Sequence, residues 1–228
     1  MACLRALLKR LPPAGDFYDI GGGNGFVAAG LDAAGYPSVL VEPGSGAINA
    51  ARRGVRRIVQ ATLQDAAFRP HALAAAGALD VIEHVEHDVK FLRLVRERLR
   101  PGGRFYCTVP AAPALWSHED ERAGHFRRYR ADTLSGALRR ASFEVEFVSP
   151  FFTWLVAPVF FCRALPSRLH RGTVSTTDWS AGAPARDHSP PAALAPFVAR
   201  VHAWELRRLQ SGRALPFGTS LIAVARAF

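Results

Sequence analysis

Glycines and carboxylates near the beginning of the chain have the types and spacing that a nucleoside-binding site needs. Residues 21–25 read GGGNG and begin two positions after Asp19. Glycine has no Cβ and tolerates positive φ, so the backbone of such a loop can approach a ligand closely. Glu42 lies 17 residues after Gly25, where a carboxylate could accept hydrogen bonds from both hydroxyls of a ribose. These residues predict a site for a nucleoside-containing cofactor, whereas a plain surface turn would leave four glycines unexplained.

The loop alone leaves more than one cofactor open. Residues 23–28 match G-x-G-x-x-A, a pattern of NAD-binding loops. Asp19 argues against a dinucleotide, because its carboxylate would repel a pyrophosphate and attract an amino group. The chain also lacks a Tyr-x-x-x-Lys pair, since neither Lys9 nor Lys90 stands four residues after a tyrosine. An NAD(P)-dependent oxidoreductase is therefore the less favoured alternative, beside a non-catalytic protein that binds its cofactor without turnover.

Histidines after the fourth expected strand could act on a second substrate. A base is needed only where the attacking group must lose a proton, and histidine suits that role near neutral pH. We expect His84 to be the base or to orient the substrate, with His125 as a weaker candidate. The alternative is that Glu83 and His84 form a helix-start pair that only holds neighbouring loops together.

The stretch at residues 116–129 is dense in aromatic and basic side chains. Arginine presents a planar fork that matches carboxylate and phosphate groups. We expect the acceptor substrate to contact Trp116, Arg127, Arg128 and Tyr129. The alternative is a structural lid in which the arginines pair with the acids at 119–121.

The three cysteines indicate neither a metal site nor a disulfide framework. Cys3, Cys107 and Cys162 are an odd number without metal-ligand spacing. We therefore expect no bound metal and a reducing, cytoplasmic compartment. The chain also contains no apolar run of the roughly 20 residues that span a bilayer, and no secretory signal is expected.

Strand and helix patterns alternate along the chain and would bring these side chains to one edge of a sheet. Short apolar stretches predict strands at residues 17–20, 38–41, 57–60, 72–79, 104–109, 143–149 and 221–226. The patterns between and around them predict helices at 1–11, 26–34, 45–53, 90–99, 131–141 and 193–210. Such alternation is typical of a parallel sheet with helices on both faces, which binds ligands at the carboxyl ends of its strands.

Four motifs together resemble the class I S-adenosylmethionine (SAM)-dependent methyltransferases. They are DIGGGNG, the acid in VLVEPG, DVIEHVEHD at 80–88 and LRPGGRFYCTVP at 99–110. Further stretches are similar to a bacterial subgroup of the small-molecule or lipid type: WSHED at 116–120, GHFRRY at 124–129 and LPFGTSLIAVAR at 215–226. The resemblance implies an α/β fold with a Rossmann-like, doubly wound sheet of seven strands, mostly parallel with a reversed last strand.

The resemblance also implies which residues bind SAM. The cofactor contacts would be Asp19, Gly21, Gly23 and Gly25 at the methionine end with Leu79 near it, Glu42 at the ribose, and Thr62 and Leu63 beside the adenine. Residues 68–79 depart from the usual pattern of the family, which has a polar loop and an acidic strand start there.

The expected organisation is one core with a long excursion near its end. Residues 1–16 would form an N-terminal cap, 17–150 the SAM-binding core, 151–215 a helical and loop region near the substrate, and 216–228 the final strand. Residues 171–192 are rich in Ser, Thr, Gly and Pro and predict a mobile loop. The apolar stretch at 150–161 predicts a core helix, with a cover for an apolar substrate or an interfacial membrane contact as alternatives.

The 228-residue chain has 29 basic and 19 acidic residues and a formal net charge of +10. This excess either is a solvated surface or attracts anions such as phosphorylated substrates or an anionic membrane face. No nucleic-acid-binding module is recognisable, so we expect no nucleic-acid partner. The prediction is a cytoplasmic SAM-dependent methyltransferase, with peripheral membrane contact as an option. Its acceptor would be a small molecule or lipid-like, with O-methylation slightly favoured.

Overall fold

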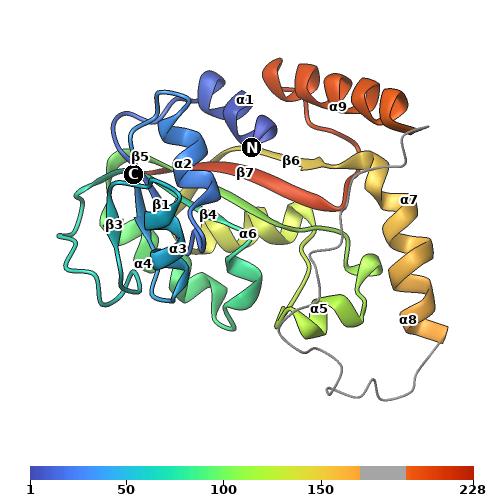
Figure 1. The fold of residues 1–228 in the computed structure, drawn as a ribbon, viewed down its shortest axis with the longest axis horizontal. Coiled ribbons are helices and arrows are strands. Elements are labelled where there is room, and N and C mark those ends of the chain that lie inside the picture. Colours follow the sequence, from blue (N-terminus) through green and yellow to red (C-terminus); the bar gives the residue numbers. More distant parts are fainter. Residues whose placement is uncertain (170–193) are drawn as a thin grey trace.

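Seven strands form one sheet in the part of the chain that the structure describes, residues 1–169 and 194–228 (Figure 1). They are β1 (Phe17–Ile20), β2 (Ser38–Val41), β3 (Ile58–Val59), β4 (Leu73–Leu79), β5 (Leu99–Pro110), β6 (Phe143–Phe151) and β7 (Ser220–Ala227). In this computed structural model the strand order is β3-β2-β1-β4-β5-β7-β6. Only β7 is antiparallel to its neighbours β5 and β6 among these strands. The predicted α/β sheet with a reversed last strand is confirmed.

Helices cover both faces of this sheet and separate its strands along the chain. They are α1 (Ala2–Arg10), α2 (Phe26–Asp32), α3 (Gly46–Arg52), α4 (Asp88–Arg98), α5 (His118–Arg122), α6 (Ala131–Arg140), α7 (Val156–Val159), α8 (Leu165–Leu169) and α9 (Ala195–Gln210). Single turns add η1 (Ile82–His84), η2 (Pro113–Leu115), η3 (Thr153–Leu155) and η4 (Phe160–Ala164). The loop predicted at 171–192 lies outside the described residues.

Two hydrophobic cores lie on opposite faces of the sheet. On one face, Leu92 of α4 and Leu134 of α6 are completely buried. On the other face, α1 and α9 lie side by side and bury Leu8 and Leu209 (Figure 1). Burial of such side chains is the main favourable term in folding, at roughly 25 cal/mol per Å² of apolar surface. These cores hold the strand ends, and hence the loops that follow them, in fixed positions.

The composition of β4 follows from its central position between β1 and β5. The strand reads LAAAGAL, a composition that favours a helix when it is considered alone. Gly77 shows why small residues are needed here, because a Cβ at that position would lie 2.4 Å from the Phe17 ring. The strand predicted at 72–79 is therefore confirmed, with tertiary packing overriding helix propensity.

The core helix predicted at 150–161 is wrong. Residues 150 and 151 end β6, and η3, α7 and η4 follow. No residue of α7 is buried, and Phe161 in η4 is 63% exposed. The segment continues from the carboxyl end of β6 and lies beyond the end of the sheet rather than beneath it (Figure 1). None of the described helices is both long enough and apolar enough to cross a membrane.

The order of the strands predicts a ligand-binding crevice between β1 and β4. From β1 the chain moves outward through β2 to β3, and then returns to place β4 on the other side of β1. Loops that leave the two inner strands therefore diverge at their carboxyl ends, which is where ligands bind in sheets of this type. The residues that follow β1, β2, β3 and β4 are thus the candidates for a site.

Candidate functional site

The loop after β1 requires glycine at several positions. The angle φ is +68° at Gly21, +53° at Gly23 and +72° at Gly25, a region that residues with a Cβ rarely adopt. A Cβ on Gly25 would in addition lie 2.6 Å from the Cβ of Ala50 in α3. The loop therefore brings α2 and α3 close together and leaves a bare backbone at the crevice.

Asp19, near the end of β1, is a buried carboxylate whose two oxygens have no hydrogen-bond partner. The residue is only 1% exposed, and a Cβ on Gly22 would lie 2.3 Å from Asp19 Oδ2. Burial raises the pKa of Asp19 to about 7; the backbone of Ala28 offsets part of this rise and the charge of Glu42 adds to it. An unpaired buried carboxylate is costly, so the position favours a ligand that brings a positive charge.

Glu42, directly after β2, connects the loops of the two neighbouring strands. Its Oε2 accepts a hydrogen bond of 2.9 Å from Gly23 N, and its Oε1 accepts one of 2.8 Å from Gly44 N. The side chain is half-buried, and each carboxylate oxygen retains a second lone pair for a further donor. Gly23, which donates to Glu42, follows Gly22, which packs against Asp19, so the two predicted acids flank the same glycine loop.

The other three predicted cofactor residues lie after β3 and at the end of β4. Thr62 Oγ1 donates to Asp65 Oδ2 at 2.6 Å, while Leu63 is buried in the core. A hollow of about 380 Å³ is lined by Thr62, Leu63, Gln64, Asp65, Phe91 and Leu94. Leu79 is half-buried at the end of β4. The predicted adenine contacts thus line an open hollow, although the Leu63 side chain faces the core.

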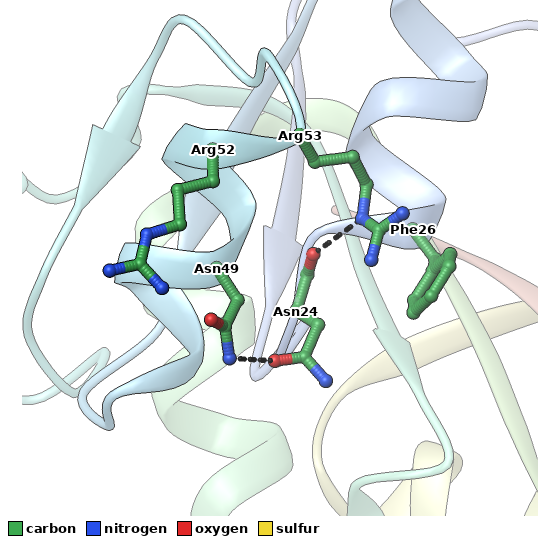
Figure 2. A pocket seen from close by; sticks show the side chains of 5 residues that line it. All are labelled: Asn24, Phe26, Asn49, Arg52 and Arg53. Atoms are coloured by element: carbon green, nitrogen blue, oxygen red, sulfur yellow. Dashed lines mark hydrogen bonds between the residues drawn. The ribbon is translucent and has the colours of Figure 1, made fainter. Parts of the chain in front are cut away.

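A second hollow, of about 390 Å³, lies between the glycine loop and α3 (Figure 2). Asn49 donates to the side chain of Asn24 at 3.0 Å, and Arg53 Nε donates to the Asn24 carbonyl at 3.1 Å. The Arg53 guanidinium also stacks 3.5 Å from the ring centre of Phe26. These contacts hold the glycine loop against α3. They were not predicted from the sequence.

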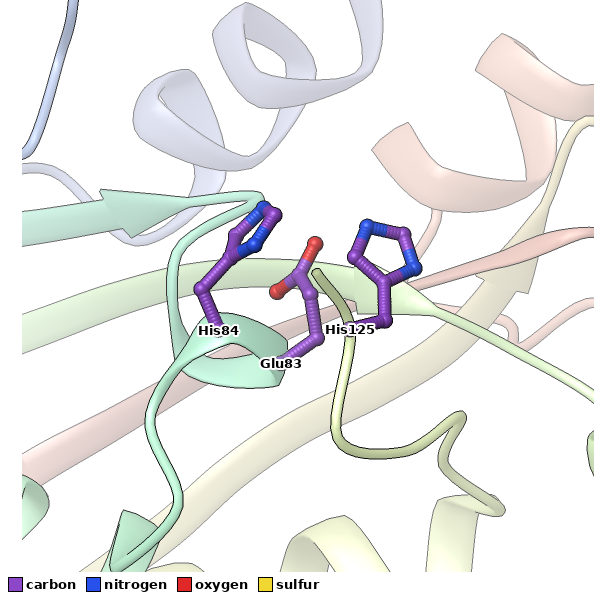
Figure 3. Close-up of side chains that lie close together, drawn as sticks. All are labelled: Glu83, His84 and His125. Carbon is purple, nitrogen blue, oxygen red and sulfur yellow. The ribbon is translucent and has the colours of Figure 1, made fainter. Parts of the chain in front are cut away.

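Glu83, His84 and His125 come together where β4 ends (Figure 3). Their candidate ligand atoms all lie within 4.8 Å of one another, and the two imidazole rings meet edge to face with centroids 4.7 Å apart. Burial raises the pKa of Glu83 to about 8. Burial also lowers the pKa of His84, and His125 lowers it further. The two histidines predicted as catalytic candidates are therefore direct neighbours.

His125 and Arg128 share one buried carboxylate, that of Asp120. His125 Nδ1 lies 2.9 Å and Arg128 Nε lies 2.8 Å from Asp120 Oδ1, while Ser117 N donates to Oδ2. Although burial opposes ionisation, hydrogen bonds from Arg128 and His125 hold the pKa of Asp120 below its usual value. Asp120 thus fixes the orientation of His125, and Arg128 has a structural partner from the predicted lid acids.

The remaining predicted substrate residues also have partners within the protein. Arg127 pairs with Asp88 at 3.0 Å, and the Tyr129 hydroxyl donates to the same carboxylate at 2.8 Å. Trp116 is half-buried, and its Nε1 donates to Glu121 at 3.3 Å. The predicted substrate contacts stay predictions, since these groups already stabilise the loop around α5.

Sequence reasoning missed a polar pair beside the crevice. Asp80 follows β4 with φ of +56°, and its Oδ1 accepts a hydrogen bond of 2.9 Å from Thr108 Oγ1 of β5. A positive φ at a residue other than glycine is uncommon and often marks a functional position. The available signal was an aspartate directly after a strand at the expected ligand edge.

Comparisons with known proteins agree with this geometry. A family model described as a methyltransferase domain matches residues 2–147. No curated protein matches the chain. A SAM-dependent methyltransferase from Mesorhizobium loti has a TM-score of 0.60 at 19% identity, with 99% of this chain and 98% of that chain covered.

Two further solved structures were determined as complexes with SAM. A geranyl diphosphate methyltransferase has a TM-score of 0.60 at 17% identity, covering 99% of this chain and 85% of that chain. Phosphoethanolamine N-methyltransferase 2 of Haemonchus contortus has a TM-score of 0.58 at 15% identity, covering 98% of this chain and 51% of that chain. At these identities the similarity shows the fold alone. The family model matches more than half of the residues of this chain, and the chain therefore belongs to the class I SAM-dependent methyltransferases.

Proposed function

We propose that the chain transfers a methyl group from SAM to a small-molecule or lipid-like acceptor, with a hydroxyl oxygen as the favoured nucleophile. The observation that carries the proposal is Asp19, a buried carboxylate without a partner beneath a glycine loop. Glu42 lies close to it and has free lone pairs. A ligand with an ammonium group and a ribose complements both acids, whereas the phosphates of NAD do not.

Each part of SAM has a counterpart at the carboxyl ends of the strands. The proposed contacts are Asp19, Gly21, Gly23, Gly25 and Leu79 with the methionine portion, Glu42 with the ribose hydroxyls, and Thr62 and Leu63 with the adenine. SAM supplies a methyl group on a sulfonium, which is already a good leaving group. The protein therefore needs chiefly to align the nucleophile and to exclude water.

His84 is the proposed base, or the group that orients the acceptor. It follows β4, and its lowered pKa favours the neutral imidazole that can accept a proton from a hydroxyl. His125 is the second candidate, although its Nδ1 is engaged by Asp120. A hydroxyl must lose a proton to act as the nucleophile, whereas a neutral amine can attack without a base. The presence of a candidate base therefore favours O-methylation.

The acceptor would enter between η1 and the loop around α5. Trp116, Arg127, Arg128 and Tyr129 are the proposed contacts, with the arginines giving up or sharing their present carboxylate partners. The two relatives named above carry geranyl diphosphate and phosphoethanolamine in their names, both of which contain phosphate. A net charge of +10 would attract an acceptor of that kind. A cytoplasmic location, with the option of peripheral contact with an anionic membrane, belongs to the same proposal.

An assay with methyl-labelled SAM tests the proposal. Alcohol, phenol, amine and phosphorylated lipid acceptors are offered, and labelled product and S-adenosylhomocysteine are measured. We expect transfer to a hydroxyl acceptor, and a loss of about 10²–10⁴-fold in rate for His84→Ala, the usual contribution of a general base. His87→Ala, at an exposed histidine on the same segment, is the matched control and should retain the rate. SAM binding without turnover across the panel would favour the non-catalytic alternative.

A further inference from the structure

Glu83, His84 and His125 have the composition and the proximity of a metal-binding site. Two imidazoles and one carboxylate offer three ligand atoms within 4.8 Å of one another, and Figure 3 shows the carboxylate of Glu83 beside the two rings. We propose that this cluster binds a divalent transition-metal ion such as Zn²⁺ through one nitrogen of each histidine and one oxygen of Glu83. Binding of the ion does not depend on the proposed methyl transfer. With the ion bound, His84 would orient the acceptor through the metal instead of acting as the base, which is the second of the two roles proposed for it above.

The separation of the ligand atoms suits an open, metal-free site. Tetrahedral zinc with bonds of about 2.0–2.1 Å holds its ligand atoms about 3.4 Å apart. The separations in the cluster, which are at most 4.8 Å, must therefore shrink by no more than about 1.4 Å. The His84 side chain is largely exposed, so a change in its conformation can supply this movement at the cost of its contacts with the backbone of Ala123 and Gly124. Three protein ligands would leave a coordination position open for water or for an acceptor oxygen.

Asp120 prepares His125 for metal binding. Metal-ligating histidines usually donate their second ring N–H to a carboxylate, which fixes the tautomer and the ring orientation. The 2.9 Å contact between His125 Nδ1 and Asp120 is of this kind, and it leaves the lone pair on Nε2 for a ligand. Asp120 is itself held by Arg128 and by the backbone of Ser117. The arrangement therefore contains an ordered outer shell as well as three ligands.

The charge around Glu83 also favours a cation. Glu83 is only 1% exposed, and its Oε2 has no hydrogen-bond partner. The carboxylates of Asp80 and Asp120 raise its pKa further, whereas Arg128 lowers it. Because Asp120 is already paired with Arg128 and His125, Glu83 and Asp80 are the acidic groups that a cation would meet here. A bound dication would neutralise the Glu83 carboxylate and would give Oε2 the partner that it lacks.

The sequence predicts no metal because the ligands do not form a local spacing motif. Glu83 and His84 are adjacent, but His125 follows 41 residues after His84. The hydrogen bond from Phe126 N to the carbonyl of Glu83, 2.8 Å long, joins the two segments and creates the cluster. Imidazole and carboxylate together suit zinc, iron, nickel and copper better than calcium or magnesium.

Calorimetric titration of the tag-free full chain with Zn²⁺ tests the site, with the visible absorption of bound Co²⁺ as a second readout. We expect one ion per chain. Affinity should fall more than about tenfold in Glu83→Gln, His84→Ala and His125→Ala, because each removes one ligand. Glu86→Gln and His87→Ala are the matched controls, three residues away in each case and exposed, and they should stay within about twofold of the unmodified chain.

Two outcomes would overturn the proposal. One is the absence of stoichiometric binding of either ion; the other is binding that the controls weaken as much as the cluster variants do. His84→Ala changes an exposed side chain, so a loss of binding in that variant is separable from a failure to fold. Because no SAM is present in the titration, a protein that binds zinc but transfers no methyl group would leave this inference intact and contradict only the proposed function.

Discussion

The protonation of Asp19 couples the cofactor crevice to the stability of the fold. Its pKa is raised from the ordinary value of 3.8 to about 7 in the folded chain, chiefly by burial. The folded state therefore holds a proton that the unfolded state releases between these two values. The stability that this proton represents is fully present below pH 4 and is lost as the pH rises through 7.

We predict that Asp19→Asn removes this pH dependence, because the amide does not titrate. The difference in unfolding free energy between the unmodified chain and Asp19→Asn should shrink as the pH rises from about 4 to 7 and then level off. A shift of about three pKa units limits the change to about 4 kcal/mol. Urea denaturation of both proteins at several pH values, without SAM, gives the difference. A difference that stays constant over this range would contradict a buried, protonated Asp19.

We predict that Glu42→Gln weakens SAM binding by about 1–3 kcal/mol, the scale of a lost hydrogen bond to a charged group. The amide retains one acceptor oxygen, so it cannot accept from Gly23 N, Gly44 N and both ribose hydroxyls as the carboxylate can. Calorimetry with SAM measures the change. Glu86→Gln, at an exposed site away from this loop, is the control that should bind as the unmodified chain does.

At the scale of elements, the glycine loop is where backbone conformation and packing meet. Gly23 and Gly25 both have positive φ, yet a Cβ on Gly23 would meet nothing within 4 Å whereas one on Gly25 would meet Ala50 at 2.6 Å. An alanine at Gly23 would therefore report the free-energy cost of the backbone conformation alone. An alanine at Gly25 would report that cost together with the steric clash against α3.

We predict that Gly23→Ala destabilises the fold by about 1–2 kcal/mol, the cost of a left-handed conformation. Gly25→Ala should cost about 1–3 kcal/mol more, because overpacking adds to the same backbone cost. Chemical denaturation of the two variants checks the difference. Equal losses would mean that α3 can move away from the loop without cost.

The elements that the sequence predicted share a local signal, and those that it missed depend on distant contacts. The glycine loop, Glu42 and the amphipathic helix α4 follow from residue type and period. The exposure of residues 156–161 does not, because an apolar run looks the same whether it is buried or free. Pairing of the arginines with the acids at 119–121 was foreseen as an alternative, but the sequence could not show that Asp120 is the acid that binds both His125 and Arg128, because only the folded loop around α5 selects it.

At the scale of the whole molecule, exposed apolar side chains lie beside basic groups on the segment that follows β6 (Figure 1). Phe161 is 63% and Leu169 is 72% exposed, and Arg168 lies between them along the chain. Exposed apolar side chains with nearby arginines are typical of contacts with anionic membrane surfaces. Such a surface would bring the protein to the membrane, where a lipid-like acceptor would be located.

We predict that the protein co-sediments with vesicles containing phosphatidylserine, and that high salt weakens this binding because it screens the arginines. The double variant Phe161→Ser with Leu169→Ser should bind several-fold less. Ile48→Ser removes an apolar side chain of α3 that is 52% exposed and serves as the control. The absence of vesicle binding, or an equal reduction of binding in the control variant, would contradict a membrane contact through this surface.

The central claim concerns the ligand that Asp19 and Glu42 bind together. The most direct test is a calorimetric titration of the unmodified chain with SAM and, separately, with NAD. We predict one SAM per chain, no heat of binding with NAD, and a loss of SAM affinity when Asp19 is replaced by Ala. Binding of NAD in place of SAM, or SAM affinity that survives the loss of both acids, would contradict it.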